Sequence, residues 1–403
     1  MTILRKYSLL IGGLGFSNLG NWIYLVALNL FVWHLTQSAA AMAGIFIVGP
    51  IARVLTSLVA GSFIDRMNKR KLMITTDIIR GLIVFSMPFM ESIWLIYTLI
   101  FLANIASSFF GPSSTFYITK LVSSEDRQRF NAILGTFNSG SFLVGPAVAG
   151  LLIMLFNTTV TIWFNSFTFF VCALIIYLLP DVDDVMETSQ QQITWQILKS
   201  DYLAVLAFIR QNSLFITIYL LFQSALMIAF ALDSQETTFI KQDLALSDSL
   251  YGAFVSSAGA GAILGGIVAA SFAKKWSIRS YIAFGLFLTM LCYTAFYAST
   301  SSILAFVSLV FLGFFMAFSN SGYETFYQQN VPPEIMGRFG SFSNILQNIL
   351  QISFTLLLGL FAELFTLQIT AIIFGIISIL FSISLYFVLY SPKNYIGLKE
   401  EIL

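Results

Sequence analysis

Three carboxylic acids lie in stretches of the chain that are otherwise apolar: Asp233, Glu236 and Glu324. An ionisable side chain is costly in hydrocarbon, so it usually faces a partner or a water-filled cavity. Burial disfavours the charged form of an acid and raises its pKa, which lets the group bind and release protons. We take these three acids as proton-coupling candidates, with a position at the outer membrane interface as the alternative for Asp233 and Glu236.

Uncharged polar residues form a second group, because they recur on single faces of apolar stretches. Between Asn344 and Gln351, amide side chains are spaced as i, i+3, i+4 and i+7, which places them on one helix face. Such a face either lines a wet cavity or forms hydrogen bonds between helices. The residues that we assign to a substrate cavity are Asn18, Asn21, Arg53, Asn320, Tyr323, Glu324, Asn344, Gln347, Asn348 and Gln351.

A third group combines one glycine, two acids and several cations. Gly61, Asp65 and Arg66 precede a short basic run, and Asp77 and Arg80 follow three residues apart. Asp65 can accept hydrogen bonds from a helix N-terminus, where the dipole favours an anion. The cations can bridge carboxylates or lipid phosphates; the alternative is that they only follow the positive-inside rule for membrane loops. For Asp77 and Arg80, we expect a pair with each other or with this loop.

The elements that carry these residues are membrane helices. Apolar residues make up 58% of the 403 residues and charged residues 10%, with a mean hydropathy of +0.87. A soluble domain carries about 25% charged residues, and a span needs roughly 20 apolar ones. The sequence predicts twelve spans, at about 8–34, 40–64, 72–90, 93–118, 130–156, 160–179, 213–237, 249–273, 280–298, 302–330, 337–362 and 366–390.

Basic residues predict the orientation of these spans. When loops are assigned alternately to two sides, one side holds almost all Lys and Arg residues and the other holds only Lys241. The positive-inside rule then places both termini in the cytoplasm. We expect the first span to be retained, because no convincing cleavage site follows it. Cys172 and Cys292 lie inside spans and are interpreted as packing residues, not as a disulfide or a metal site.

An internal repeat divides the chain into two similar halves. At an offset of 209 residues, Glu125 and Arg129 fall on Glu334 and Arg338, and Gly150 falls on Gly359. We therefore expect an N-terminal half at 1–180, a cytoplasmic linker with an amphipathic helix at 181–212, and a C-terminal half at 213–403. Two repeated membrane halves build a site that can open to either side, which favours transport.

The loop that begins at Gly61 resembles the signature of the major facilitator superfamily, and its extension is similar to the macrolide-efflux and siderophore-exporter branch. The second half carries a matching segment from Pro332 to Arg338. The resemblance implies an all-α fold of twelve transmembrane helices in two six-helix halves, in the inner (plasma) membrane of a bacterium. Asn68 stands where the family often has glycine, and asparagine tolerates a left-handed turn. The implied cytoplasmic latch comprises Gly61, Asp65, Arg66, Arg70, Lys71, Asp77, Arg80, Gly337 and Arg338.

Two further motifs bear on the direction and coupling of transport. Gly140, Gly145, Pro146 and Gly150 are similar to the family's antiporter helix, which accompanies export, and an internal proline also kinks a helix. Exporters of this type often have a buried arginine in the fourth span. Here the corresponding residues are Ala103 and Asn104, so that proton coupling does not carry over simply.

The best interpretation is a secondary active exporter of amphipathic small organic molecules, of drug, macrolide or siderophore type, driven by proton antiport. The absence of a Gly-x-x-x-x-Gly-Lys-Ser/Thr motif argues against ATP as the driving force. We expect lipid, cargo and protons as partners, a monomer, and no cofactor, metal, nucleic acid or enzymatic activity. Two alternatives stay open: a lipid or lysolipid translocator, and a membrane sensor or scaffold that does not transport.

Overall fold

We obtained the structure as a computed structural model of the chain, which describes residues 3–182, 195–272 and 275–391. Within these ranges some side chains are also outside the description, among them those of residues 57–63, 65 and 66. Every regular element in the described ranges is helical. The first six long helices are α1 (Ile3–Thr36), α2 (Ala39–Arg66), α3 (Lys69–Ser86), α4 (Ile93–Leu121), α5 (Ser124–Leu155) and α6 (Thr158–Leu178), with a short turn η1 (Met87–Phe89) after α3.

The second part of the chain begins with α7, which is the helix predicted in the linker. Two short elements then connect α8 to α10. The elements are α7 (Trp195–Gln211), α8 (Ser213–Asp233), α9 (Glu236–Thr238), η2 (Phe239–Asp243), α10 (Asp248–Phe272), α11 (Ile278–Ala298), α12 (Ser302–Asn330), α13 (Pro333–Leu364) and α14 (Leu367–Tyr390).

Eleven of the described helices are long and apolar enough to cross a membrane, and α5 contributes a bent pair that would make twelve. The pair comprises residues 133–142 and 144–155, which meet at 43°. Pro146 lies four residues after the first segment ends. Because the ring of a proline clashes with the carbonyl four residues before it, Pro146 accounts for a bend at this place. The all-α membrane fold expected from the sequence is confirmed.

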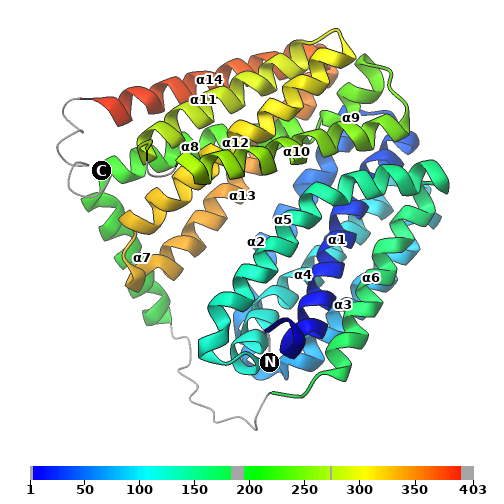
Figure 1. Ribbon diagram of the computed structural model, residues 1–403, viewed down its shortest axis with the longest axis vertical. Helices are drawn as coiled ribbons and strands as arrows, with labels where there is room; N and C mark the ends of the chain where they lie inside the picture. The colour runs from blue at the N-terminus through cyan, green and yellow to red at the C-terminus, as the bar shows by residue number, and fades with distance from the viewer. Residues whose placement is uncertain (1–2, 183–194, 273–274, 392–403) are drawn as a thin grey trace. The chain divides into compact units, whose positions relative to one another are not determined.

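The helices gather into two compact units (Figure 1). Unit 1 comprises residues 1–37, 48–191 and 247–256, and unit 2 comprises residues 38–47, 192–246 and 257–403. In unit 1, α1 packs on α5 and α6, while α3 packs on α4 and α6. In unit 2, α11 packs on α12 and α14, and α8 packs on α13 and α14. The first turns of α2 thus group with the C-terminal helices, and those of α10 group with the N-terminal ones.

The internal repeat is visible in the helix ends. Ser124 and Leu155 bound α5, and Pro333 and Leu364, each 209 residues further along, bound α13. The two ends of α4 correspond to those of α12 in the same way. A close contact also repeats: a Cβ built on Gly252 would lie 2.5 Å from the Cα of Gly150, and one on Gly359 would lie 2.7 Å from the Cβ of Ala43. The repeat therefore extends from sequence to helix crossings.

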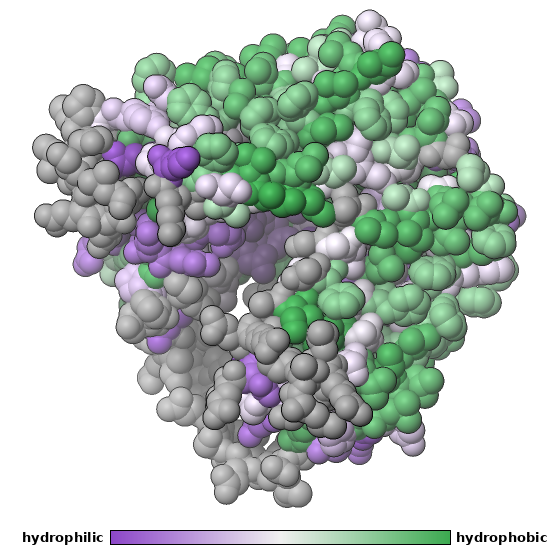
Figure 2. All heavy atoms as spheres, viewed as in Figure 1, coloured by the Kyte–Doolittle hydropathy of each residue, from purple (hydrophilic) through white to green (hydrophobic). Residues whose placement is uncertain are grey.

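Apolar side chains cover the outward faces of α3 and α6 in unit 1 and of α11 and α14 in unit 2 (Figure 2). These helices expose large hydrophobic residues such as Leu82, Leu174, Phe284 and Leu380. A large exposed apolar surface is unusual for a soluble protein, but in a lipid bilayer such a surface contacts the apolar lipid tails. The polar groups described below are therefore the exceptions that need an explanation.

Candidate functional site

The carboxylate of Asp233 lies at the end of α8, where α11 passes beside it in unit 2. The hydroxyl of Tyr293 on α11 donates a hydrogen bond of 2.7 Å to Oδ1 of Asp233. One turn further along α11, the hydroxyl of Tyr297 donates to the backbone carbonyl of Leu232. The spacing of acids in the sequence did not reveal Tyr293, which is sixty residues away and comes close only through the packing of α11 on α8.

Glu236 begins the short helix α9, after the membrane-length part of α8 has ended. Its Oε1 atom is shielded from solvent and has no hydrogen-bond partner within the described structure. The same holds for the side-chain oxygens of its neighbours Gln235 and Thr238. Burial, together with the nearby charge of Asp233, raises the pKa of Glu236 to about 8. At neutral pH Glu236 therefore holds a proton, which ordinary glutamate does not.

Glu324, the third acid of the sequence analysis, has a different environment. It is exposed on α12, as is Asn320 one turn earlier. Tyr323 between them is buried, with its ring stacked on that of Phe222 at 4.0 Å and its hydroxyl accepting a hydrogen bond of 2.9 Å from Gln223. Gln223, a single buried amide in the apolar helix α8, was not singled out from the sequence. The side chain of Glu324 is thus exposed, while that of Tyr323 is held by its contacts with Phe222 and Gln223.

The amide residues of α13 are partly engaged with their own helix. The Nδ2 atom of Asn348 donates to the backbone and side-chain oxygens of Asn344, at 2.7 and 2.9 Å. Gln347 donates to Ser343 at 3.2 Å, and Ser343 shares a hydrogen bond with the hydroxyl of Tyr219 on α8. Asn348 is buried, Asn344 is exposed, and Gln347 and Gln351 are half-buried. The predicted face therefore exists, but part of it is satisfied by intrahelical bonds.

In unit 1 the strongest polar centre is the ion pair of Asp77 and Arg80 on α3. The two side chains are almost completely buried, and a guanidinium nitrogen lies 3.1 Å from Oδ1 of Asp77. A second nitrogen donates to Oδ1 of Asn21 on α1 at 3.4 Å. The guanidinium also lies 3.9 Å from the centre of the Phe169 ring, a cation–π contact that the sequence pattern did not predict. Of the two partners left open by the sequence, the structure shows the pair with each other.

The two remaining residues of the predicted cavity in unit 1 lie on α1 and α2. Asn18 is half-buried on α1. Arg53 is exposed on α2, and its guanidinium donates to Oδ1 of Asn104 on α4 at 3.4 Å. Asn104 is the residue next to Ala103 on α4. The guanidinium beside Asn104 thus belongs to Arg53 on α2 and not to a residue of α4.

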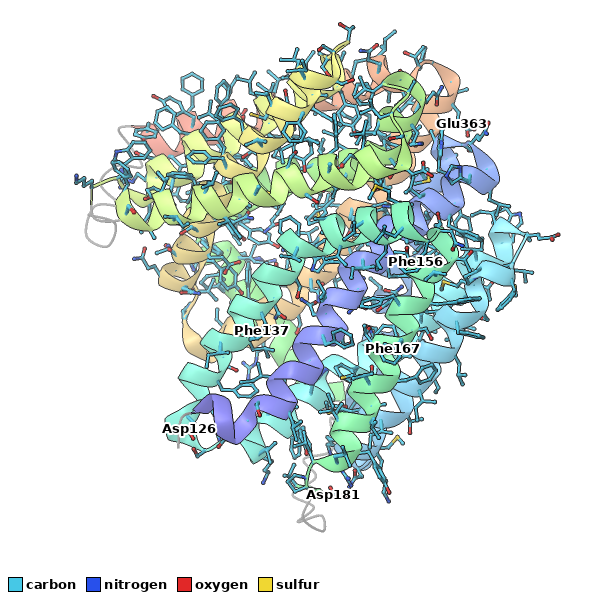
Figure 3. All side chains as sticks on the ribbon, turned by 45° about the vertical axis from the view of Figure 1, so that its right-hand side comes forward. Asp126, Phe137, Phe156, Phe167, Asp181 and Glu363 are labelled. Atoms are coloured by element: carbon cyan, nitrogen blue, oxygen red, sulfur yellow. The ribbon has the colours of Figure 1, made fainter. Side chains whose placement is uncertain are left out.

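The glycines of α5 allow close helix crossings in unit 1. A Cβ on Gly145 would lie 2.5 Å from the Cβ of Trp22 on α1, and Gly150 contacts Gly252 of α10. Gly140 is half-buried beside an apolar cavity of about 520 Å³ between α1 and α5. Phe137, labelled in Figure 3, also lines this cavity. Because glycine has no side chain, α5 approaches α1 closely at Gly145 and α10 closely at Gly150, before and after Pro146.

The predicted latch is only partly covered by the structure. The structure does not describe the surroundings of Gly61 and Gly337 or the side chains of Asp65 and Arg66. Lys71 and Arg338 are exposed. Arg70 donates through Nε to the carbonyl of Ile176 at 3.2 Å and binds the carbonyl of Tyr177 as well.

Arg70 therefore caps the end of α6, and it also lies 4.0 Å from Asp181. The amide of Asn68 donates to both oxygens of Asp181, at 3.1 and 3.0 Å. Figure 3 shows Asp181 at the same end of unit 1 as Asp126. Asn68 does not adopt the left-handed conformation: its φ is −63°, and its side chain accepts a hydrogen bond from the backbone N–H of Lys71 as the N-cap of α3.

The chain matches a known family over most of its length. The model described as Major Facilitator Superfamily matches residues 10–355 and, in a second match, residues 236–401. The chain therefore belongs to the Major Facilitator Superfamily. That family is one of membrane transporters and not of enzymes.

Curated relatives are distant. The MFS-type transporter YfiS of Bacillus subtilis (strain 168), described as uncharacterized, is 25% identical over 272 residues, which are 66% of this chain and 63% of that protein. The putative bacilysin exporter BacE of the same strain is 27% identical over 41% of this chain and 42% of its own length. Multidrug resistance protein 2 of that strain is 22% identical over 58% and 57%. Each match spans less than two thirds of the relative's length.

Solved structures show the fold. The nucleoside transporter NupG has a TM-score of 0.72 at 15% identity and covers 96% of this chain and 99% of its own. A bacterial homolog of the human lysosomal transporter Spinster, in an inward-facing and unoccupied conformation, has a TM-score of 0.72 at 14% identity, with 97% and 100% covered. At such identities the likeness concerns the fold alone.

Proposed function

We propose that the protein exports amphipathic small organic molecules by proton antiport. The observation that supports this most directly is the group formed by Asp233, Tyr293 and Glu236 in unit 2. It places one acid on a tyrosine hydroxyl and a second acid, whose Oε1 is shielded and has no hydrogen-bond partner in the described structure, three residues away. Among the relatives are a putative bacilysin exporter and a multidrug resistance protein, which agree with the export of organic compounds.

In this proposal Glu236 carries the proton and Asp233 sets its affinity. When Glu236 is protonated, it no longer repels the negative charge of Asp233. The loss of the proton from Glu236 is then favoured only when water or a cation reaches the segment. Alternating access would supply that change of environment. Glu324, which is exposed on α12, is the alternative carrier of the same role.

The charged groups of unit 1 have another role. Because Asp77 and Arg80 neutralise one another in a buried contact, their pair adds no net charge to the interior. We propose that this pair holds Asn21 on α1 in position, and that Arg53 beside Asn104 replaces the arginine absent from α4. The polar residues of α12 and α13 would then complete a cavity in which a few polar groups recognise a largely apolar cargo.

For the direction of transport, the bent helix α5 supports export. Its Gly145, Pro146 and Gly150 match the antiporter pattern, and the bend of 43° lies just before the proline. The macrolide-efflux and siderophore-exporter branch is the finer assignment that we propose. The basic loops and the bacterial relatives support a location in the plasma membrane, with both termini in the cytoplasm.

We further propose that Asp65 joins Gly337 and Arg338 in a cytoplasmic latch. The contacts of Arg70 suit a base for that latch, because they fasten the start of α3 to the end of α6. Asp65→Asn should then increase the labelling of the inner cavity by thiol reagents and slow transport. Wild-type labelling together with wild-type transport would argue against the latch.

Efflux of a fluorescent cationic dye from proteoliposomes tests the proposed function. With a pH gradient imposed, wild-type protein should move the dye, while Asp233→Asn and Glu236→Gln should lose most of the gradient-driven rate. Asp243→Asn, an exposed acid of the same connecting segment, is the matched control and should keep it. Movement of fluorescent lysolipid but not of dye would favour a lipid translocator, and movement of neither would favour a sensor or scaffold.

A further inference from the structure

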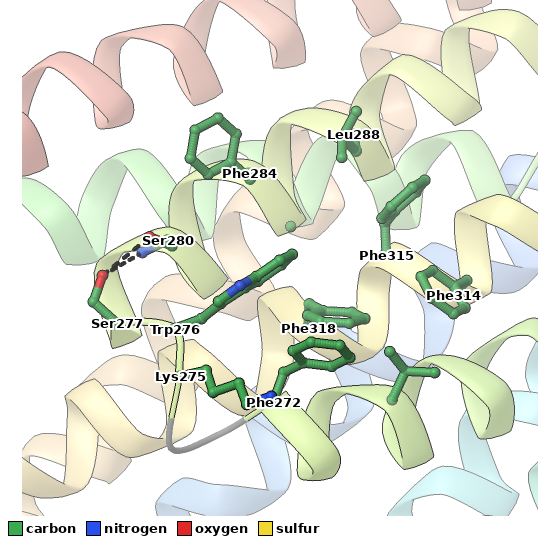
Figure 4. A pocket seen from close by; sticks show the side chains of 12 residues that line it. Phe272, Lys275, Trp276, Ser277, Ser280, Phe284, Leu288, Phe314, Phe315 and Phe318 are labelled. Atoms are coloured by element: carbon green, nitrogen blue, oxygen red, sulfur yellow. Dashed lines mark hydrogen bonds between the residues drawn. The ribbon is translucent and has the colours of Figure 1, made fainter.

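A second cavity, distinct from the acidic group and from the predicted cargo site, lies in unit 2 where α10, α11 and α12 meet (Figure 4). Its volume is about 570 Å³. Half of the twelve lining residues are aromatic, with Phe272, Trp276, Phe284, Phe315 and Phe318 among them. The ring of Trp276 packs between neighbours, 5.6 Å from that of Phe272 and 6.1 Å from that of Phe318. Contacts between these rings thus define an apolar space.

One side of this cavity is polar and basic. Lys275, Ser277 and Ser280 gather there, and Figure 4 shows them opposite Leu288 and Phe315. The ammonium of Lys275 lies 5.6 Å from the centre of the Phe272 ring. The hydroxyls of Ser277 and Ser280 are 3.0 Å apart. Among the described residues that line the cavity none is acidic, so the charge of this side is positive.

The cavity opens on a surface that faces lipid. Trp276 and Phe284 are 52% and 48% exposed, on the apolar outward face of unit 2. Tryptophan favours the boundary between headgroups and hydrocarbon, and lysine extends its ammonium toward the headgroups. Lys275 also belongs to the basic side of the chain, which the positive-inside rule assigns to the inner leaflet. A ligand that fits must therefore have an anionic head and an apolar tail.

We propose that this cavity binds an anionic phospholipid of the inner leaflet, with the phosphate at Lys275 and Ser280 and an acyl chain along Phe284 and Phe315. A zwitterionic lipid would offer the same tail but no net charge to Lys275, and anionic lipids attract basic residues at the surface. The bound lipid would join α10, α11 and α12 without being transported. Its role would be to support the packing of these three helices.

Tryptophan quenching by brominated lipids tests this site, because Trp276 lies in its wall. Wild-type protein and Trp276→Phe are reconstituted in vesicles that contain brominated phosphatidylglycerol or brominated phosphatidylcholine, and their difference isolates the signal of Trp276. We expect about fivefold preference for phosphatidylglycerol at this residue, the contribution of one lysine near an anionic surface. Lys275→Gln should bring the preference close to one, while its thermal unfolding in lipid-free detergent stays that of wild type.

Lys120→Gln is the matched control, because Lys120 also lies beside a phenylalanine ring, 6.0 Å from the centre of Phe116, but outside the cavity. It should leave the preference at Trp276 unchanged. Equal quenching by the two lipids in wild type would overturn the proposal, as would equal losses in Lys275→Gln and Lys120→Gln. Displacement of the brominated lipid by the transported dye would assign the cavity to cargo and would also overturn it.

Discussion

The hydroxyl of Tyr293 and the carboxylate of Asp233 lie 2.7 Å apart and join α11 to the end of α8. A hydrogen bond to a charged group is worth about 1.5–3 kcal/mol, more than most side-chain contacts. The bond therefore fixes the rotamer of the acid as well as the distance between the two helices. Both effects bear on how a proton is held.

Removal of this hydroxyl should impair coupling without unfolding the protein. We expect Tyr293→Phe to reduce gradient-driven dye efflux by roughly tenfold, the equivalent of about 1.4 kcal/mol. Tyr297→Phe is the control, because it removes the same group one turn along, where it donates to a backbone carbonyl. If both variants transport dye equally, the bond to Asp233 has no part in coupling.

The pH dependence of stability should reveal the proton on Glu236. Its pKa of about 8 in the folded protein lies above the ordinary value of 4.5, so the folded protein keeps a proton that the unfolded chain releases. The stabilising contribution is complete below pH 4.5 and is lost as the pH rises toward 8. Glu236→Gln should therefore flatten the fall in Tm between pH 5 and pH 8 by roughly 2 °C or more.

Thermal unfolding in detergent at several pH values measures this difference. Glu91→Gln, which changes an exposed acid in the loop before α4, should leave the wild-type slope intact. A slope that is the same in wild type and Glu236→Gln would show that Glu236 does not keep its proton in this range.

The buried pair of Asp77 and Arg80 should be far more sensitive than an exposed pair. Asp77→Asn leaves the Arg80 guanidinium buried without its counter-charge, and such a loss costs about 3–5 kcal/mol. Asp181→Asn removes the partner of Arg70 at 4.0 Å near the surface, where a pair contributes about 0–1 kcal/mol. Chemical or thermal unfolding of both variants should separate them clearly, and equal small losses would mean that Arg80 is not held by Asp77.

Close helix crossing at Gly252 gives a prediction with an internal control. Gly252→Ala places a methyl group 2.5 Å from the backbone of Gly150, and we expect a loss of about 1–3 kcal/mol from overpacking. Gly266→Ala, on the same helix α10, meets nothing within 4 Å and should be neutral or slightly stabilising. Unfolding measurements that rank the two variants in the opposite order would contradict the contact.

Sequence patterns predicted the helices better than the polar contacts. The apolar stretches and the offset repeat suffice for twelve spans and for the correspondence of α5 with α13, because length and hydropathy decide membrane insertion. The helix α7 lies within 181–212, the stretch for which a linker helix was expected. At Asn68 the N-cap of α3 does not need the left-handed conformation that asparagine tolerates.

Partners that come from other helices could not be predicted in the same way. Tyr293 is one of sixteen tyrosines, and nothing in its neighbourhood of sequence marks it as the donor to Asp233. Asn348 was assigned to a polar face by its spacing, but its bond to Asn344 depends on a rotamer, which periodicity does not specify. Rotation of a helix about its axis is decided by packing against its neighbours, and that information is distributed over the whole chain.

The matching ends of the repeated helices have a consequence for the evolution of the chain. Asp233 corresponds to Tyr24 in the first copy, and Asp77 and Arg80 correspond to Leu286 and Thr289 in the second. At these three positions one copy thus has a charged residue where the other copy has a neutral one. After a duplication, the two copies can specialise, because a charged residue gained in one copy does not change the corresponding residue of the other copy. A single ancestral unit paired with itself would have carried every acid twice.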